Sequence, residues 1–332
     1  MLNRIGRIRV GVIGHGTIGR RVASAVARQA DMTLSGVVAR RLTPRLHSTV
    51  STGVDLYSDD DPASFASAGL AVSGRMVDLL ARIDVIVDCG PRGTGRDRQS
   101  QYTRAGVAAV FQGGEAADVA GCDFTTVARS SEPQGASLRV TSCNTTGLAR
   151  IVAALHQIGD VLRVTAVLVR AASDSDKASK GSPNAVLAHL GPTHHAEDLA
   201  GLFPGIAFET AGCHVPTNRG HLAHVFVEWD AAPPPHEVAA KLSSAEGVRL
   251  CREGGGGLDD LGRIADYSGD AEQVLVWERS LRTKGNRTSL AAAIHMEAVV
   301  IPDTLEAIRF IAASRRAKAL HTPAGRSARS TC

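Results

Sequence analysis

Residues 7–19 read RIRVGVIGHGTIG, an apolar stretch that runs directly into three glycines spaced as G-x-G-x-x-G. Gly14 permits a tight turn after a strand, and Gly16 lets the backbone approach a pyrophosphate closely. Gly19 allows the following helix to pack against the strand. The N-terminus of that helix presents free amide groups to phosphates. The stretch therefore predicts a dinucleotide-binding fold near the start of the chain.

Strand-like and helix-like segments alternate through the first part of the chain. Apolar runs typical of buried strands lie at residues 7–13, 33–38, 83–88, 107–111 and 138–142. Strands separated by helical stretches indicate a parallel sheet with helices on both faces. We therefore expect an α/β architecture that begins with a Rossmann dinucleotide-binding domain over residues 1–142.

The pattern changes after this region. A marked helix comes first, with Asn144, Thr145 or Thr146 as its expected cap. Longer strand patterns with fewer helices between them follow, at residues 164–169, 221–229, 275–281 and 289–295. This change predicts an α+β catalytic domain over residues 143–301, built on a mixed or antiparallel sheet.

The end of the chain divides into a helix and a tail. The pattern over residues 302–316 predicts a helix that completes the first domain, with Asp303 as its cap. Residues 317–332 are rich in Arg, Ala and Ser, and we expect them to form a disordered tail.

Length and composition bound the class of protein. At 332 residues the chain is about twice a typical domain, with 44% hydrophobic and 21% charged residues, as in ordinary globular proteins. The net charge of +4 is small and aromatic residues reach only 4%, which argues against a nucleic-acid-binding surface. No apolar run approaches the roughly 20 residues that span a bilayer. Six widely scattered cysteines fit neither a disulfide scaffold nor a metal site and favour a cytoplasmic location.

The end of the second expected strand bears on the choice of cofactor. A domain that binds NAD usually places a carboxylate there, about 20 residues after the glycines, to bind the ribose hydroxyls. The chain instead reads Val38-Ala39-Arg40-Arg41. Two guanidinium groups can pair with a 2′-phosphate, so the sequence favours NADP over NAD. The alternative, in which Arg40 and Arg41 are only solvated turn residues, stays open.

Cys143 is the candidate nucleophile. It follows an expected strand and stands at the start of the marked helix. The positive end of a helix dipole and its free amide groups favour the ionised thiol, which is the reactive form. The other five cysteines lack this placement. The sequence therefore predicts thiol chemistry at Cys143 rather than at another cysteine.

A thiol that attacks an aldehyde also needs a base and a donor to the developing oxyanion, and histidine suits both tasks. The candidates are His214, His221, His224 and the pair His194-His195. Periodicity does not choose among them, although His221 and His224 would face opposite sides of one regular strand. For the pair, a solvated loop is the alternative reading, and a metal site is disfavoured.

Several motifs together resemble one family. Ser142-Cys143-Asn144-Thr145-Thr146-Gly147 is similar to the nucleophile motif of the archaeal-type (type II) glyceraldehyde-3-phosphate dehydrogenases. The resemblance extends in matching order to Gly14–Arg21, Phe111–Glu115, Lys180-Gly181, Thr193-His194-His195, Val215-Pro216-Thr217 and Val276-Trp277-Glu278. It covers nearly the whole chain, from Arg7 to Ile311.

The resemblance implies roles for the matching residues. Cys143 would be the nucleophile and His221 the base. The dinucleotide would contact Thr17, Ile18 and Gly113, with Arg170 near it or near the substrate phosphate. The aldehyde and phosphate sites would be lined by Ser142, Asn144, His194 and His195. In the implied reaction the aldehyde is oxidised as a thioester, and inorganic phosphate then releases an acyl phosphate. The resemblance also implies a homotetramer.

The chain departs from the family's pattern near its anion sites. Ala171 follows Arg170 where the family carries two consecutive arginines, and Met296 stands where it carries a glutamine. The sequence therefore predicts a phosphorylating glyceraldehyde-3-phosphate dehydrogenase and leaves two alternatives open. One is a related dehydrogenase that acts on another small aldehyde or acyl phosphate. The other is a non-catalytic regulatory protein that only binds the cofactor.

Overall fold

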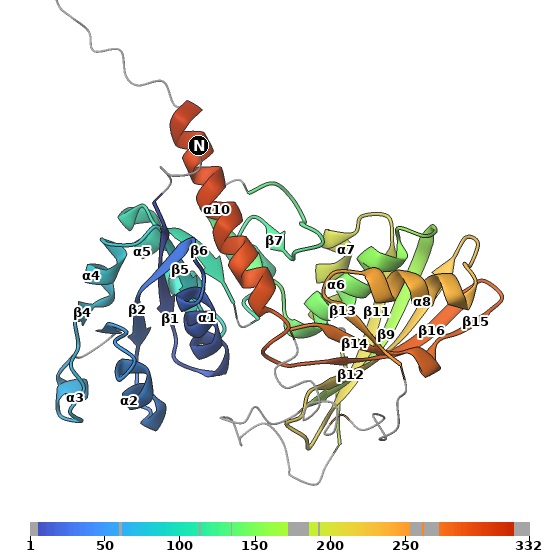
Figure 1. Cartoon of the computed structure of the whole chain (residues 1–332), viewed down its shortest axis with the longest axis horizontal. Helices are drawn as coiled ribbons and strands as arrows, with labels where there is room; N and C mark the ends of the chain where they lie inside the picture. Colours follow the sequence, from blue (N-terminus) through green and yellow to red (C-terminus); the bar gives the residue numbers. More distant parts are fainter. Residues whose placement is uncertain are drawn as a thin grey trace, which may run out of the picture.

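The computed structural model describes residues 6–59, 62–112, 114–133, 135–171, 186–191, 193–252, 261 and 272–321. These residues form two eight-stranded sheets with helices around them (Figure 1). Gly113 and the Lys180-Gly181 motif lie outside the described residues. Within the described part of the chain, no helix is both long enough and apolar enough to cross a membrane.

The first sheet has the strand order β4-β3-β2-β1-β5-β6-β8-β7, and all of its pairings are parallel. The predicted doubly wound fold is thereby confirmed. Its strand order reverses between β1 and β5, which is where such sheets bind dinucleotides. The strands are β1 (Ile8–Ile13), β2 (Met32–Ala39), β3 (Leu56–Ser58), β4 (Gly74–Arg75), β5 (Val85–Asp88), β6 (Ala108–Phe111), β7 (Asp123–Phe124) and β8 (Ser137–Val140).

The helices that follow β1, β4 and β5 pack against strands of the first sheet. The first helix buries Val22, Ala23 and Val26 at helical spacing. The shorter helices were not predicted from hydrophobic periodicity, because five to seven residues contain too few helical turns to show it. These elements are α1 (Thr17–Ala27), α2 (Pro44–Val50), α3 (Pro62–Ala66), α4 (Met76–Leu80), α5 (Thr94–Ala105) and the 3-10 turn η1 (Ala117–Val119).

The C-terminal helix α10 (Ile301–His321) returns to the first sheet and packs against α1, β6 and β8 (Figure 1). It extends beyond the range expected from the sequence, so residues 317–321 are helical rather than part of a tail. The expectation that Asp303 caps this helix is wrong. Asp303 lies inside the first turn, where its carboxylate pairs with Arg150 and accepts the backbone N–H of Thr126 at 2.7 Å.

The second sheet is mixed, as predicted, with the order β10-β11-β9-β12-β16-β14-β13 and β15 paired to β16. The strand expected over 275–281 ends at Trp277, where the 3-10 turn η2 (Glu278–Ser280) begins. The strands are β9 (Val161–Ala171), β10 (Leu187–Ala188), β11 (Ala207–Val215), β12 (His221–Trp229), β13 (Val248–Cys251), β14 (Val274–Trp277), β15 (Arg282–Lys284) and β16 (Arg287–Ile294).

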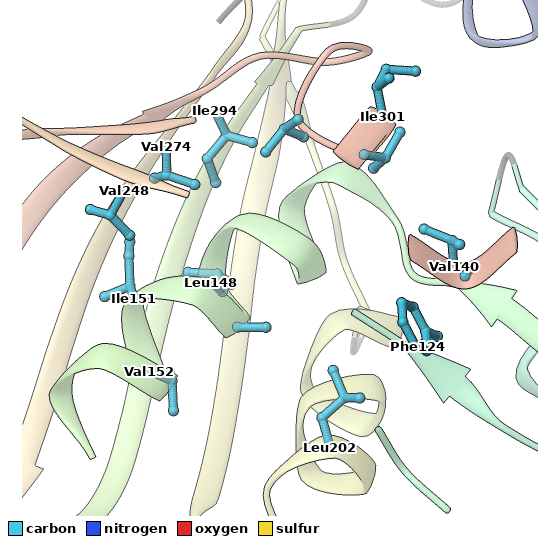
Figure 2. Close-up of a cluster of buried hydrophobic side chains, with 14 of the residues drawn as sticks. Phe124, Val140, Leu148, Ile151, Val152, Leu202, Val248, Val274, Ile294 and Ile301 are labelled. Carbon is cyan, nitrogen blue, oxygen red and sulfur yellow. The ribbon is translucent and has the colours of Figure 1, made fainter. Parts of the chain in front are cut away.

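Three helices cover one face of the second sheet: α6 (Cys143–Leu155), α7 (His194–Leu202) and α8 (Pro235–Ser244) (Figure 1). Leu148, Ile151 and Val152 of α6 are fully buried. Figure 2 shows them among Val248, Val274 and Ile294 of the second sheet, with Phe124 and Val140 of the first sheet nearby. The two sheets therefore share one hydrophobic core, and α6 lies inside it.

The buried ion pair between Arg150 and Asp303 ties α6 to α10 within this core. Arg150 is 2% exposed and Asp303 is 0% exposed. The guanidinium also donates to the backbone oxygens of Glu272 at 2.6 Å and Val299 at 2.9 Å. Removing one partner of such a pair leaves a buried charge without compensation.

We expect Arg150→Met to lower the free energy of unfolding by about 3–5 kcal/mol, measured by urea denaturation. The matched control is Arg163→Met, because Arg163 pairs with Glu209 at 2.8 Å on the exposed surface. That variant should lose less than about 1 kcal/mol, since solvent screens surface pairs. Equal losses in the two variants would contradict the role given to the buried pair.

Candidate active site

The first turn of α6 presents the candidate nucleophile. Ser142 is the N-cap, and its Oγ accepts the backbone N–H of Thr145 at 3.4 Å. Cys143 follows as the first residue of the helix and is half-buried. The cap expected at Asn144, Thr145 or Thr146 therefore lies earlier in the chain, because the Ser142 hydroxyl already satisfies a free amide of the first turn.

Helix α7 brings His195 to this cap. Its Nδ1 lies 3.2 Å from Oγ of Ser142 and 3.0 Å from Oγ1 of Thr145. The Thr145 hydroxyl in turn donates to Oδ2 of Asp198 at 3.3 Å. His195 is fully buried, and its Nε2 has no hydrogen-bond partner among the described residues. The ring is thus held on one side and leaves a buried polar atom on the other.

A buried ion-pair network supports this arrangement from the first sheet. Arg139 donates to Asp198 Oδ1 at 2.6 Å, to Asp123 Oδ1 at 2.6 Å and to the backbone oxygen of Glu115 at 2.9 Å. Sequence reasoning missed this network. Its only signal was an arginine inside an apolar strand pattern, since a buried charge in such a place requires a partner. The network joins β8 to α7 and so positions His195 beside Cys143.

His221 lies on the same side of the second sheet as α6. On β12 the residues of its parity, Ala223, Val225 and Val227, are fully buried, whereas His224 is exposed. His221 stands opposite Ile294 in the antiparallel register. A Cβ placed on Gly147 would lie 2.7 Å from the Ile294 side chain, so this part of α6 touches the strand pair closely. Gly147 is about one helical turn from Cys143, so the face of β12 that carries His221 lies against this half of α6.

The backbone N–H of Ala171 donates to Nδ1 of His221 at 2.9 Å. Burial, with a contribution from the charge of Arg170, lowers the pKa of His221 from 6.5 to about 3. Burial likewise lowers the pKa of His195 to about 2, helped by the neighbouring His194 and Arg170. Both imidazoles are therefore neutral near pH 7.

Arg170 contributes positive charge to this region. It lies opposite His214 in the register of β9 and β11. Its charge contributes to the lowered pKa values of His194, His195 and His221, so all of them lie within its electrostatic reach. Its Nε is buried and has no hydrogen-bond partner within the described residues. An unpaired guanidinium N–H of this kind suits an anion.

Asn144 and His194 complete the set of residues expected around the substrate. Asn144 is fully buried, and neither polar atom of its amide has a hydrogen-bond partner in the described ranges. His194 stacks against His195 with 4.0 Å between ring centroids. Burial lowers the pKa of His194, although Asp198 acts in the opposite direction. The structure thus brings the expected substrate residues together around the first turns of α6 and α7.

The glycine loop has the shape that a dinucleotide requires. A Cβ on Gly14, which has φ of 91°, would lie 2.7 Å from the backbone oxygen of Cys89. A Cβ on Gly19 would overlap the backbone oxygen of Gly14. Gly16 is different, because a Cβ there would meet nothing within 4 Å. The N-cap of α1 at Gly16 therefore borders open space, and the helix has no acidic residue in its first turn, so its N-terminus fits a pyrophosphate.

Further basic groups surround the glycine loop. Arg40 and Arg41 are exposed immediately beyond the end of β2. His15, within the loop, bonds Oγ1 of Thr49 through Nε2 at 2.7 Å. Burial and the charges of Arg20 and Arg45 lower the pKa of His15 to about 4. His15 is therefore neutral near pH 7, and the positive charge around the loop comes from arginines.

Three of the other described cysteines are poor candidates for the nucleophile. Burial raises the pKa values of the Cys89, Cys122 and Cys251 thiols above their ordinary value. A raised pKa suppresses the thiolate, which is the nucleophilic form. These three thiols are therefore poor nucleophiles at neutral pH.

Comparison with known proteins places the chain in a family. Residues 142–274 match the family described as glyceraldehyde 3-phosphate dehydrogenase, C-terminal domain. The chain is 37% identical over 318 residues to the glyceraldehyde-3-phosphate dehydrogenase of Aeropyrum pernix, covering 92% of this chain and 93% of that protein. The enzyme of that name from Haloarcula marismortui is also 37% identical, with coverages of 91% and 88%.

A solved structure shares the fold at low sequence identity. Aspartate semialdehyde dehydrogenase II from Vibrio cholerae superposes with a TM-score of 0.66 at 12% identity, covering 92% of this chain and 98% of that one. The sequence relatives are the stronger evidence for the family, because their similarity extends over nearly the full length of the chain. This chain belongs to the glyceraldehyde-3-phosphate dehydrogenase family.

Proposed function

We propose that this protein is a phosphorylating glyceraldehyde-3-phosphate dehydrogenase that converts the aldehyde, inorganic phosphate and oxidised NAD(P) into an acyl phosphate and reduced NAD(P). The observation that carries the proposal is that Cys143 opens α6 directly after Ser142, whose Oγ lies 3.2 Å from Nδ1 of His195, and that His221 and Arg170 both act electrostatically on His195. The names of the full-length relatives support the same activity.

The chemistry begins at Cys143. Its thiolate adds to the aldehyde carbon, and loss of a hydride from that carbon leaves a thioester. Bound NAD(P) supplies the acceptor of this hydride. Inorganic phosphate then attacks the thioester carbonyl, which releases the acyl phosphate and regenerates the thiolate. The buried amide of Asn144 and Nε2 of His195 offer the substrate polar partners next to the reacting carbon.

Arg170 is the candidate for binding phosphate groups at this site. The neighbouring histidines are held neutral by burial and contribute hydrogen bonds rather than charge. The orphaned Nε of Arg170 can donate to a phosphate oxygen. Arg170 therefore offers a permanent positive charge to a dianionic group at this site.

The cofactor is held by the glycine loop, with contacts from Gly14, Gly16, Thr17, Ile18 and Gly19, and Gly113 is retained as an expected contact. We propose that NADP is preferred to NAD. Arg40 and Arg41 follow β2 where a ribose-binding carboxylate would otherwise stand. Arg45 adds positive charge close to the loop, as its effect on His15 indicates.

The first test is turnover of glyceraldehyde-3-phosphate, followed by the absorbance of the reduced cofactor with and without inorganic phosphate. We expect phosphate-dependent turnover that falls by about 10³-fold or more in Cys143→Ser. Cys251→Ser is the matched control and should keep wild-type activity, because this half-buried residue of β13 packs with Leu275 and Ala293 in a cluster separate from the core around α6. Turnover that survives in Cys143→Ser would contradict the assigned nucleophile.

A related dehydrogenase for another small aldehyde is the second candidate. Ala171 favours it, because the position offers no guanidinium beside Arg170. The same assay separates the two candidates. Cofactor binding without turnover of glyceraldehyde-3-phosphate, together with a Cys143 thioester formed from another aldehyde, would support the second candidate over the first.

The cofactor preference has its own test in the double variant Arg40→Gln/Arg41→Gln. We expect kcat/KM for NADP to fall about tenfold or more, since charge-assisted hydrogen bonds to the 2′-phosphate are lost, while kcat/KM for NAD stays unchanged. Arg28→Gln, on the exposed end of α1, serves as the control. A parallel fall with both cofactors would argue that these arginines do not read the 2′-phosphate.

We also propose a homotetramer in which the uncovered face of the second sheet forms an interface. Val167 on β9 is 39% exposed on that face, because its neighbours Ala166 and Leu168 are buried on the opposite one, and Leu162, at the register irregularity of the same strand, is 50% exposed. Large apolar side chains on one sheet face are a common mark of subunit contact.

Light scattering at micromolar concentration tests this assembly. The wild type should be a tetramer, and Val167→Asp should shift it to smaller species by placing a charge in the interface. Val77→Asp on α4, where Val77 is 64% exposed, should leave the tetramer intact. A monomeric wild type would overturn the proposal.

A further inference from the structure

His15 stands between Gly14 and Gly16 in the glycine loop, and the thiol chemistry at Cys143 gives it no role. Its Nε2 lies 2.7 Å from Oγ1 of Thr49 on α2. Its Nδ1 is buried and has no hydrogen-bond partner among the described residues. Buried polar atoms are normally paired, so this nitrogen is suited to a group on a bound ligand.

The loop holds His15 beyond the carboxyl ends of β1 and β2. The backbone N–H of Gly14 donates to the oxygen of Val38 at 3.0 Å, next to the pairing of Ile13 with that residue. Helix α2, which His15 contacts through Thr49, begins shortly after the two arginines that follow β2. In a dinucleotide-binding sheet, the end of the second strand reads the 2′ position of the adenosine ribose. The imidazole therefore lies in the neighbourhood of that position.

The contacts of Thr49 set the tautomer of the neutral ring. The Thr49 hydroxyl donates to the backbone oxygen of Arg45 at 3.4 Å. A hydroxyl has one proton to give, so its oxygen accepts the Nε2–H of His15. A neutral imidazole holds one proton, and Nδ1 therefore carries a lone pair. In this form Nδ1 can accept a ribose hydroxyl, but it repels the oxygens of a phosphate.

The charges around His15 decide whether the ring can hold a second proton. Burial lowers its pKa from 6.5 to about 4, and the positive charges of Arg20 on α1 and Arg45 on α2 act in the same direction. Arg40 and Arg41 are exposed in the turn between β2 and α2, so they add positive charge from the remaining side. A dianion bound among these groups would offset their charge and favour a protonated ring.

We propose that His15 binds the 2′ substituent of the adenosine ribose, and that it takes up a proton when this substituent is a phosphate. The neutral ring accepts the 2′-hydroxyl of NAD at Nδ1, whereas the charged ring donates from Nδ1 to the 2′-phosphate of NADP. The proton comes from solvent, and no covalent bond is broken. The inference rests on the proposed cofactor binding at the glycine loop, and it adds that the choice between the two cofactors depends on pH.

The direction of this pH dependence follows from the linkage between proton and cofactor. Binding of NADP raises the pKa of His15, so the affinity for NADP increases as the pH falls. Binding of NAD leaves the ring neutral, so its affinity does not depend on this proton. We expect the Kd for NADP to rise about three- to tenfold between about pH 6.5 and pH 8.5, while the Kd for NAD stays constant. This range lies above the second pKa of a phosphate monoester, about 6.

Isothermal titration calorimetry of the whole protein, in two buffers whose ionisation enthalpies differ, counts the protons taken up with each cofactor. At about pH 7 we expect NADP to bind with more proton uptake than NAD, by up to about one proton per site. In His15→Asn, whose amide can still form hydrogen bonds but does not titrate, the difference should vanish and the Kd for NADP should no longer change with pH. His47→Asn, on the exposed surface of α2, is the matched control and should behave as wild type.

Equal proton uptake with the two cofactors in the wild type would overturn the proposal, and so would an uptake difference that persists in His15→Asn. Both results leave the proposed dehydrogenase activity untouched, because they are measured without aldehyde. The expected uptake together with no turnover of glyceraldehyde-3-phosphate would support the role of His15 and count against the proposed function alone.

A spectroscopic measurement on the wild type makes the test independent of any variant. In ¹⁵N-labelled protein at about pH 7, NMR should find His15 protonated only at Nε2, both without cofactor and with NAD. With NADP bound, both ring nitrogens should carry a proton. An unprotonated Nδ1 in the NADP complex would contradict the inference.

Discussion

The burial of α6 between two sheets is the constraint on which the site depends. Leu148, Ile151 and Val152 are fully buried in a core that draws residues from both sheets. A helix held on both sides cannot slide or rotate without opening voids in a close-packed interior, which costs free energy in proportion to their volume. The first residue of this helix is Cys143, so its thiol is fixed by the same packing that joins the sheets.

The packing around this helix also buries charged side chains. They form ion pairs with residues that are distant in the sequence. Arg150 meets Asp303, and Arg139 bridges Asp123 and Asp198. Such pairs add little net stability, but they penalise any arrangement that separates the partners. Of the buried polar atoms without partners in the described residues, several gather at Asn144, Arg170 and His195, and others lie by the glycine loop at His15 and Thr43. Buried groups are normally satisfied, so the unpaired atoms at Asn144, Arg170 and His195 support the proposed substrate site.

The sequence predicted the features that are written in local patterns. The glycine loop, the buried parallel strands and the helix that starts at Cys143 each follow from residues within a few positions of one another. Strand β11 escaped notice because Ala207–Val215 mixes small, polar and charged residues. The Arg139 network and the bond from Ala171 to His221 join residues tens of positions apart, and no periodicity encodes such contacts. They emerge only when the sheets and helices are assembled.

In the assembled site, the histidines provide neutral hydrogen-bonding groups and the arginine provides positive charge. Burial holds His195 and His221 neutral, so they serve as directional hydrogen-bonding groups whose tautomers are set by neighbours. Positive charge stays on Arg170, because a guanidinium resists losing its proton where an imidazole does not. Arg170 in turn helps to suppress protonation of the histidines around it. Arg170 at the end of β9 can thereby offer charge to the proposed anion, and together with burial it helps to keep the adjacent imidazoles in the neutral form that can donate to, or accept from, an uncharged carbonyl and hydroxyl.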